Sequence, residues 1–310
     1  MKILITEFMD EAAVASLQAS FQTTYDATLV DRRAEMLEKL ADVDALIVRN
    51  RTQVNAEVLA AAPKLKVVGR LGVGLDNIEL PACKARNVEV IPATGANALA
   101  VAEYVIATAM ILLRVAYVST ASVTAGQWPR GPLSNGREIG GKTLGIVGFG
   151  GIGQLTASLA QGLGMRVVAT DPMINAASPV WKETGVTCLS LDQLLAESDV
   201  ISLHIPLVSE TRNLINAARL ATMKPDAVLI NSARGGIIDE TALAAALKAK
   251  RLGGAALDVF DVEPLKVGSP FTDCPNLVLT PHIAGVTAES NTRVSSMIAE
   301  RVAAFLTSPR

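Results

Sequence analysis

The sequence predicts an α/β protein with two doubly wound parallel sheets. Strand-like apolar runs alternate with amphipathic helical stretches in two series, one before and one after about residue 100. This alternation is typical of parallel sheets whose faces are covered by helices. The chain has 310 residues, of which 50% are hydrophobic and 19% are charged. That balance indicates a folded protein, and the length is sufficient for two domains.

The first series contains four apolar runs that predict buried strands. They are KILIT at 2–6, DALIVR at 44–49, KVVGR at 66–70 and VEVIP at 88–92. Amphipathic stretches at 10–19, 33–40 and 56–61 separate the first three runs and predict helices. This order of elements predicts a first parallel sheet.

Residues 98–118 form a long helix-compatible stretch that is apolar on most of its circumference. A helix of this kind must be buried on all sides. Burial in the core of its own domain and burial in an interface between subunits both remain open. Residues 125–142 are rich in Gly, Pro and polar residues, and they predict an exposed loop.

A second series of six strand candidates follows: TLGIVGFG, RVVATD, VISLHIP, AVLINSA, GGAALDVF and NLVLTPH. Six strands with helices between most of them are enough for a complete doubly wound sheet. A glycine-rich motif lies on the first strand, which makes this series the candidate for nucleotide binding. Residues 288–306 predict a single amphipathic helix at the end of the chain.

Charge and cysteine usage exclude several classes of protein. Lys and Arg total 28 against 30 Asp and Glu, a net charge of −2, so the basic surplus typical of nucleic-acid binding is not present. Cys83, Cys188 and Cys274 are far apart and odd in number. A disulfide framework or a structural zinc site is therefore not expected, and a reducing cytoplasm fits best.

Neither targeting nor membrane insertion is expected. The N-terminus reaches Glu7 after only a few apolar residues, which is too soon for a signal peptide. Residues 143–165 are uncharged but contain seven glycines. Within 98–118, Glu103 and Arg114 leave only ten uncharged residues between them, whereas a spanning helix needs about 20.

The glycine motif has the form G-x-G-x-x-G and occurs between a predicted strand and a predicted helix. Gly148 permits the tight turn, Gly150 lets the backbone approach a pyrophosphate, and Gly153 lets the helix pack closely on the strand. Gly151 and Ile152 complete the turn. The helix N-terminus that follows supplies unpaired N–H groups for phosphate oxygens.

Asp171 ends the next strand, 18 residues after Gly153. A carboxylate at this position accepts hydrogen bonds from the ribose hydroxyls of NAD and repels the extra phosphate of NADP. We therefore expect NAD as the cofactor. The alternative is that Asp171 only caps a turn before Pro172.

Four chemically versatile side chains follow strands of the second series. His204 and His282, the only histidines in the chain, each end an apolar run, and Arg234 and Glu263 follow two others. Ligands of open α/β sheets bind at the carboxyl ends of strands. A histidine can take the proton of a secondary alcohol, a carboxylate can orient the histidine, and an arginine can grip a substrate carboxylate. By position alone, each could also be structural.

The chain resembles the D-isomer-specific 2-hydroxyacid dehydrogenases, and within them the phosphoglycerate dehydrogenase branch. The resemblance rests on the glycine turn with Asp171 and on VVGRLGVGLDNI, LHIPLVSETRNLI, INSARGGIIDE, ALDVFDVEP and LTPHIAG. It covers about residues 49–285. It implies a flavodoxin-like substrate-binding domain at 1–97 and 286–310, and a Rossmann-type NAD-binding domain at 98–285. It further implies a cleft between the domains and a homodimer joined through the long helix.

The resemblance also implies roles for individual residues. Arg234 grips the substrate carboxylate, Glu263 pairs with the histidine, and His282 accepts the proton. The residues implied in cofactor contacts beyond the glycine turn are His204, Pro206, Thr211, Ala233 and Asp258. In the first domain, Val73 and Gly74 hold the substrate carboxylate through backbone N–H groups, and Asn97 lies beside the substrate. These chemistries need no metal ion.

Two departures from the family pattern are visible. Gly151 stands where many relatives carry Arg or Lys, so a side-chain contact to the pyrophosphate is lost while the backbone contacts remain. The chain ends without the C-terminal regulatory domains of many phosphoglycerate dehydrogenases. That difference weakens an assignment to the phosphoglycerate reaction.

Arginines in the first domain suggest a second anionic group on the hydroxy-acid substrate. Arg49, Arg51 and Arg70 end two strands, and Arg130 lies in a loop that can reach a neighbouring subunit's site in relatives. We place Arg49 in the substrate site. D-3-phosphoglycerate fits such a cluster, and so does sulfolactate. If the arginines are structural, glyoxylate or hydroxypyruvate reduction is favoured.

A hypothesis of another class is a corepressor-like protein, in which the same fold binds NAD to control assembly with partner proteins. Such proteins keep a similar Arg, Glu and His set, so the set does not exclude them. Long flanking regulatory segments are missing from this sequence, and this favours the enzyme. The expected partner is therefore a small 2-hydroxy acid.

Overall fold

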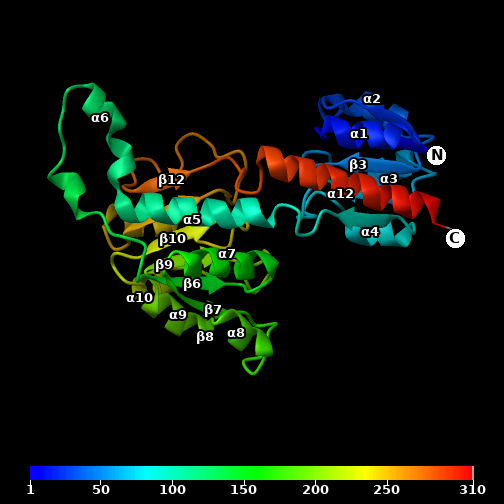
Figure 1. The fold of residues 1–310 in the computed structure, drawn as a ribbon. Coiled ribbons are helices and arrows are strands. Elements are labelled where there is room, and N and C mark those ends of the chain that lie inside the picture. Colours follow the sequence, from blue (N-terminus) through cyan, green and yellow to red (C-terminus); the bar gives the residue numbers. More distant parts are fainter. Residues whose placement is uncertain (309–310) are drawn as a thin grey trace. The chain divides into compact units, whose positions relative to one another are not determined.

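The computed structural model describes residues 1–308 and divides into two compact units (Figure 1). Unit 1 comprises Met1–Asn97 and Val286–Arg310, and unit 2 comprises Ala98–Gly285. Each unit is built on its own fully parallel sheet with helices on both faces. The predicted fold class, two parallel-sheet α/β domains, is confirmed.

Unit 1 has a five-stranded sheet in the order β2-β1-β3-β4-β5, which is the flavodoxin-like order. The strands are β1 (Lys2–Ile5), β2 (Gln22–Tyr25), β3 (Ala45–Val48), β4 (Val67–Arg70) and β5 (Glu89–Pro92). The helices are α1 (Glu11–Gln18), α2 (Arg33–Lys39), α3 (Ala56–Ala61), α4 (Leu80–Ala85) and α12 (Ala288–Thr307), with a 3₁₀ turn at Leu29–Asp31.

Alternation along the strands of unit 1 divides its apolar residues between two cores. Ile3 and Ile47 face α1 and α12, whereas Leu4 and Leu46 face α2 and α3. The C-terminal helix α12 thus completes the core of the N-terminal sheet, which makes unit 1 discontinuous in sequence. All strands point the same way, so their carboxyl ends share one edge.

Unit 2 has a seven-stranded sheet in the order β8-β7-β6-β9-β10-β11-β12. The first strand in sequence is central and the order reverses beside it, as in Rossmann folds. The strands are β6 (Thr143–Val147), β7 (Arg166–Thr170), β8 (Thr187–Cys188), β9 (Val200–Leu203), β10 (Val228–Asn231), β11 (Gly254–Leu257) and β12 (Leu277–Leu279).

Helices of unit 2 cover both faces of this sheet. One core packs against α5 (Ala98–Arg114), α7 (Gly151–Gly162) and α8 (Pro179–Thr184). The other packs against α9 (Leu191–Glu197), α10 (Ala217–Thr222) and α11 (Glu240–Lys248). A short helix α6 (Thr120–Thr124) and 3₁₀ turns at Ala116–Ser119 and Pro132–Asn135 lie in the segment between α5 and β6.

The helix predicted at 98–118 is shorter than expected, because α5 ends at Arg114. Val115 adopts the left-handed conformation, with φ of 57°, which stops the helix. The returning chain then packs on this end. Arg137 donates its backbone N–H to the Leu113 carbonyl at 2.9 Å, and a Cβ at Gly136 would lie 2.3 Å from the Arg114 carbonyl oxygen.

Among residues 1–308, no single helix is both long and apolar enough to cross a membrane. The bent pair Ala98–Arg114 and Ala116–Thr124, with 68° between its members, meets the length and composition criteria together.

Candidate active site

His282 and Glu263 form a hydrogen-bonded pair in unit 2. Nδ1 of His282 lies 2.8 Å from Oε2 of Glu263, and the second carboxylate oxygen accepts the backbone N–H of Phe260 at 3.0 Å. Both side chains come from loops that follow strands, β12 for the histidine and β11 for the glutamate. The carboxylate therefore orients the imidazole, and Nε2 is left for proton transfer.

The loop that carries His282 is held by Asp258, which is 1% exposed. One oxygen of its carboxylate accepts the N–H of Ile283 at 2.8 Å, and the other accepts the N–H of Ala284 at 2.8 Å. The N–H of His282 reaches the Asp258 carbonyl at 2.8 Å. These bonds secure a left-handed backbone at His282, with φ of 56°, which is costly for a residue other than glycine.

A chain of hydroxyl groups ends on the same carboxylate. Thr280 donates its hydroxyl hydrogen to Asp258 at 2.6 Å, and the hydroxyl groups of Tyr104 and Thr280 are 2.7 Å apart. Because a carboxylate only accepts, Thr280 must donate to it, so Tyr104 donates to Thr280. Burial raises the pKa of Tyr104, which keeps it a donor at neutral pH.

Arg234 lies in the loop after β10, which the Asn231 side chain shapes. The amide nitrogen of Asn231 donates to the Arg234 carbonyl at 2.9 Å, and its oxygen accepts the N–H of Ala233 at 3.0 Å. The guanidinium of Arg234 donates to the Ala233 carbonyl at 2.6 Å. Asn231 is 2% exposed, and its buried side-chain amide fixes the backbone at Ala233 and Arg234.

The glycine turn between β6 and α7 has the geometry that a bound pyrophosphate requires. Gly148 has φ of 95°, and a Cβ there would lie 2.4 Å from the His204 carbonyl oxygen. A Cβ at Gly153 would lie 2.3 Å from the Gly148 carbonyl oxygen. At Gly150 and Gly151, nothing lies within 4 Å of the Cβ position. The backbone is thus open where phosphates approach, and the first N–H groups of α7, including that of Ile152, have no helical partner.

Asp171 follows β7 and already holds the turn together. One carboxylate oxygen accepts the N–H of Phe149 at 2.8 Å, and the other accepts the N–H of Met173 at 2.9 Å. Each oxygen can accept a second hydrogen bond. The capping arrangement and the ribose contact considered from the sequence are therefore compatible with each other.

The segment after β9 contains three further candidates, His204, Pro206 and Thr211. Burial lowers the pKa of His204 to about 4, so this ring is neutral at pH 7. The Thr211 hydroxyl donates to the Pro206 carbonyl at 2.7 Å and accepts the N–H of Val208 at 2.8 Å. In the structure, Thr211 shapes the loop that carries Pro206.

In unit 1, the candidate groups lie at the carboxyl ends of β3, β4 and β5. The backbone N–H groups of Val73 and Gly74 have no hydrogen-bond partner among residues 1–308. The Asn97 side-chain oxygen is buried and likewise has none within that range. Unit 1 therefore offers two free backbone donors for a ligand, and Asn97, which follows the next strand end in the sequence, holds a buried oxygen without a partner among the described residues.

The arginines of unit 1 differ in how their charge is compensated. The Arg49 guanidinium donates to the amide oxygen of Asn291 at 2.8 Å and lies 5.7 Å from the ring centre of Phe8. Both of these partners are uncharged. Burial lowers the pKa of Arg49, and the charge of the Glu7 carboxylate opposes that shift. Arg51, in contrast, forms an exposed ion pair with Asp31.

Glu7, which is 4% exposed, fixes the loop that carries Arg49. Its carboxylate accepts the backbone N–H groups of Arg49, Arg51 and Thr52 at 2.8, 3.0 and 2.9 Å. The backbone direction of the loop is therefore set independently of the arginine side chain.

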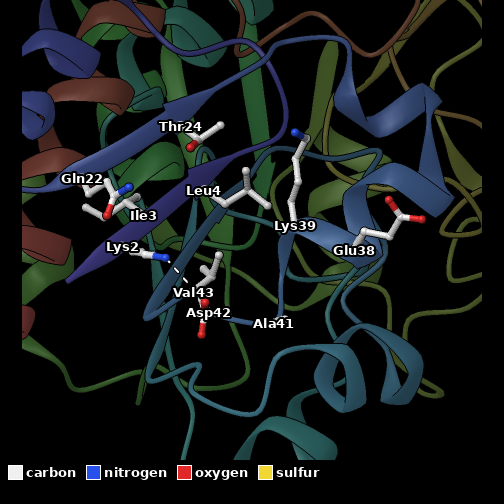
Figure 2. Close-up of a pocket in the computed structure, with 10 residues that line it drawn as sticks. All are labelled: Lys2, Ile3, Leu4, Gln22, Thr24, Glu38, Lys39, Ala41, Asp42 and Val43. Atoms are coloured by element: carbon white, nitrogen blue, oxygen red, sulfur yellow. Dashed lines mark ion pairs between the residues drawn. The ribbon is translucent and has the colours of Figure 1, made fainter.

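Figure 2 shows a different hollow, of about 240 Å³, lined by residues that include Lys2, Lys39 and Asp42. It lies at the amino ends of β1 and β3, whereas ligands of parallel sheets bind at the carboxyl ends. Lys2 pairs with Asp42, and Lys39 pairs with Glu35. Both lysines around this hollow are therefore already paired, and it is not the candidate site.

Several residues that shape the site were not singled out by sequence reasoning. Glu7 holds the loop after β3. Asn231 and Ser202 form hydrogen bonds with residues two or three positions away, and Asp258 was assigned only to the cofactor. A polar residue inside or at the end of an apolar run is the signal that could have found them, since burial of such a group demands a partner.

Comparisons with known proteins agree with this geometry. Residues 106–284 match the family model described as "D-isomer specific 2-hydroxyacid dehydrogenase, NAD binding domain". The chain is 54% identical to the (S)-sulfolactate dehydrogenase of Chromohalobacter salexigens over 97% of this chain and 96% of that protein. It is 41% identical to the D-3-phosphoglycerate dehydrogenase of Mycobacterium leprae over 97% of this chain, but it spans only 56% of that protein.

Solved structures show the same architecture. A protein from Thermus thermophilus aligns with a TM-score of 0.86 and 34% identity, covering 99% of this chain and 97% of that one. A glyoxylate reductase from Paecilomyes thermophila aligns with a TM-score of 0.85 and 29% identity, covering 99% and 95%. The chain belongs to the D-isomer-specific 2-hydroxyacid dehydrogenases, and it is an NAD-dependent oxidoreductase of that family.

Proposed function

We propose that this enzyme oxidises (S)-sulfolactate to the corresponding 2-keto acid, with Arg234, Glu263 and His282 as its catalytic residues. The pair of Nδ1 and Oε2, 2.8 Å apart, is the observation that carries the reaction. The Arg49 guanidinium, which forms no ion pair and no hydrogen bond with a carboxylate among residues 1–308, is the observation that favours a dianionic substrate.

In the proposed reaction, Nε2 of His282 removes the hydroxyl proton of the substrate. Glu263 stabilises the positive charge that forms on the ring. Arg234 binds the C1 carboxylate through its guanidinium and holds C2 in place. The glycine turn and Asp171 would hold NAD, which when bound would supply the acceptor for the hydride of C2. The proposal assigns the N–H groups of Val73 and Gly74 to the same carboxylate and Asn97 to the substrate's surroundings.

Roles in cofactor binding follow from the same proposal. The N–H groups of the turn and of α7 bind the pyrophosphate, and Asp171 accepts from the adenosine ribose. The remaining contacts come from His204, Pro206, Thr211, Ala233 and Asp258. The open space at Gly150 and Gly151 supports this assignment.

The substrate assignment rests on charge and on relatives. A half-buried guanidinium that forms no ion pair is stabilised by an anion. Glu7 acts on Arg49 only through its charge, without a hydrogen bond to the guanidinium, and a sulfonate would supply a direct partner. The relative named for sulfolactate is 54% identical, whereas the phosphoglycerate dehydrogenases from Synechocystis and Mycobacterium leprae are 39% and 41% identical.

The configuration of sulfolactate is consistent with a D-specific site. Sulfur outranks oxygen in the priority rules, so the sulfonate arm of sulfolactate ranks above its carboxylate. In D-lactate, the carboxylate ranks above the methyl group. The label (S) on sulfolactate therefore describes the same spatial arrangement as the label (R) on D-lactate.

The test is NADH formation with both stereoisomers of sulfolactate, D-3-phosphoglycerate, D-lactate and D-glycerate. We expect the highest kcat/KM with (S)-sulfolactate. Arg49→Gln should lower that value roughly 10- to 100-fold and leave D-lactate oxidation nearly unchanged. Arg51→Gln, whose charge Asp31 already compensates, is the matched control.

Other outcomes would change the proposal in defined ways. Preference for D-3-phosphoglycerate would keep the second anion site and replace the sulfonate by a phosphate. Equal rates with D-lactate would show that Arg49 is structural and would favour reduction of small keto acids such as glyoxylate.

We also propose a cytoplasmic homodimer. Cys83, Cys188 and Cys274 are all free thiols, as expected in a reducing compartment. Large apolar side chains are exposed between α5 and β6, including Tyr117, Val118 and Trp128. A second copy of the chain would remove them from water.

A further inference from the structure

Ser202 and His204 lie two residues apart at the end of β9, so their side chains are on the same face of the sheet. The Ser202 hydroxyl oxygen lies 2.9 Å from Nε2 of His204. Ser202 is completely buried, and Nε2 is its only hydrogen-bond partner among residues 1–308. The hydroxyl hydrogen therefore has one acceptor within reach.

This arrangement determines which ring nitrogen of His204 carries the proton. A hydrogen on Nε2 would point at the serine oxygen, and the buried hydroxyl hydrogen would then have no acceptor. With the opposite tautomer, Ser202 donates to Nε2, and both atoms of this buried contact are satisfied. The favoured form of His204 is thus the neutral ring with its hydrogen on Nδ1.

Nδ1 itself remains free to donate to a ligand. Nδ1 has no hydrogen-bond partner among the described residues. It is also absent from the set of fully buried side-chain atoms that lack a partner. The backbone of His204 adjoins the glycine turn, because its N–H donates to the Val147 carbonyl at 2.7 Å. Its carbonyl oxygen is the atom that a Cβ at Gly148 would meet at 2.4 Å.

We infer that Ser202 is a positioning residue for cofactor binding, which fixes His204 as an Nδ1–H donor to an oxygen of the bound dinucleotide. The inference rests on NAD binding at the glycine turn. Burial is the only cause that shifts the pKa of His204, and no charged side chain contributes. The Nδ1–H donor is therefore uncharged at neutral pH. The Ser202 hydroxyl is the group that determines which ring nitrogen carries the hydrogen.

The tautomer is measured directly by long-range ¹H–¹⁵N NMR of the unmodified protein without cofactor. The chain has two histidines, and the spectrum of His204→Gln assigns the two sets of signals. We expect His204 to show a protonated, pyrrole-type Nδ1 and an unprotonated, pyridine-type Nε2. A protonated Nε2 would overturn the inference, whatever the cofactor affinity.

The functional consequence is tested with Ser202→Ala and Ser202→Thr. Loss of the hydroxyl should let the Nε2–H tautomer appear and raise the Kd for NADH roughly three- to tenfold. The threonine variant keeps the hydroxyl and should restore both the tautomer and the Kd. Thermal unfolding of each variant shows whether it is folded.

The outcomes separate this inference from the proposed function. A changed tautomer in Ser202→Ala with unchanged Kd would show that Nδ1 does not contact the cofactor, and would overturn the positioning role alone. If the unmodified protein does not bind NADH, the proposed cofactor site itself is wrong. If the threonine variant folds but behaves like alanine, the effect comes from packing and the inference fails.

Discussion

In the proposed reaction, proton transfer depends on one nitrogen, Nε2 of His282, because Nδ1 lies 2.8 Å from the Glu263 carboxylate. The carboxylate does not need to move during the reaction, since Phe260 also holds it through a backbone N–H. Asp258 fixes the histidine backbone from the other side. The His282–Glu263 pair therefore has its hydrogen-bonded geometry before substrate binds. Polar groups that are already oriented lower the activation barrier because they do not have to reorganise during the reaction.

Replacing His282 by Ala should lower kcat about 10²- to 10⁴-fold, because the general base is lost. Glu263→Gln should lower kcat by roughly 10²-fold, since a neutral amide cannot stabilise the charged ring. Steady-state rates with the preferred hydroxy acid measure both effects. The Kd for NADH, measured by fluorescence, is the control and should stay within a small factor of its original value. A His282→Ala enzyme that retains its kcat would contradict the assigned base.

The sequence was sufficient to propose the pair of Glu263 and His282, but not the hydrogen bonds that hold the loop of His282 in place. Strand-end position and the family motifs pointed to Glu263 and His282, and the structure places them within hydrogen-bond distance. The clamp formed by Asp258 depends on the path of residues 280–284, because its partners are backbone N–H groups. Every residue except proline has a backbone N–H, whatever its side chain. The residue types at these positions therefore do not reveal the contact with Asp258.

At the scale of elements, the close approach of α7 to β6 depends on Gly153. A Cβ at this position would lie 2.3 Å from the carbonyl oxygen of Gly148, a backbone atom that cannot rotate away. Gly162, at the other end of the same helix, has nothing within 4 Å of its Cβ position. The helix therefore has no room for a larger side chain at Gly153 but has room for one at Gly162.

Gly153→Ala should displace the N-terminus of α7, weaken NADH binding at least tenfold and lower the melting temperature. Gly162→Ala is the matched control and should be neutral or slightly stabilising, because alanine favours helix more than glycine does, by about 1 kcal/mol. Calorimetry and NADH titration of the two variants make the comparison. Equal behaviour of both variants would show that the turn relaxes without cost.

Elements with strong apolar runs could be predicted, and those without could not. All ten strand candidates correspond to observed strands, because buried parallel strands are continuous apolar runs. The edge strand β2, Gln22–Tyr25, escaped prediction because it is polar and only partly buried. Helix α4, Leu80–Ala85, was not predicted, because it buries only Cys83, whereas the equally short α3 buries two apolar residues, Val58 and Leu59.

For the whole molecule, one segment of unit 2 exposes several large apolar side chains close together in the sequence. The part of the chain between α5 and β6 exposes Val115, Tyr117, Val118, Val123 and Trp128. The exposed fraction is 79% for Trp128 and 69% for Val118. Contiguous exposed apolar residues of this kind mark an interface with another protein, and in the proposed homodimer a second copy covers them.

Val118→Asp combined with Trp128→Ala should convert the proposed dimer to a monomer. The aspartate places a charge where the interface would exclude water, and the alanine removes the largest exposed aromatic side chain of the segment. Sedimentation velocity over a range of protein concentrations measures the mass. The matched control is Met173→Asp with Val267→Ala, since both residues are highly exposed but lie elsewhere in unit 2. A monomeric parent protein, or a double variant that stays dimeric, would show that this segment does not join two copies.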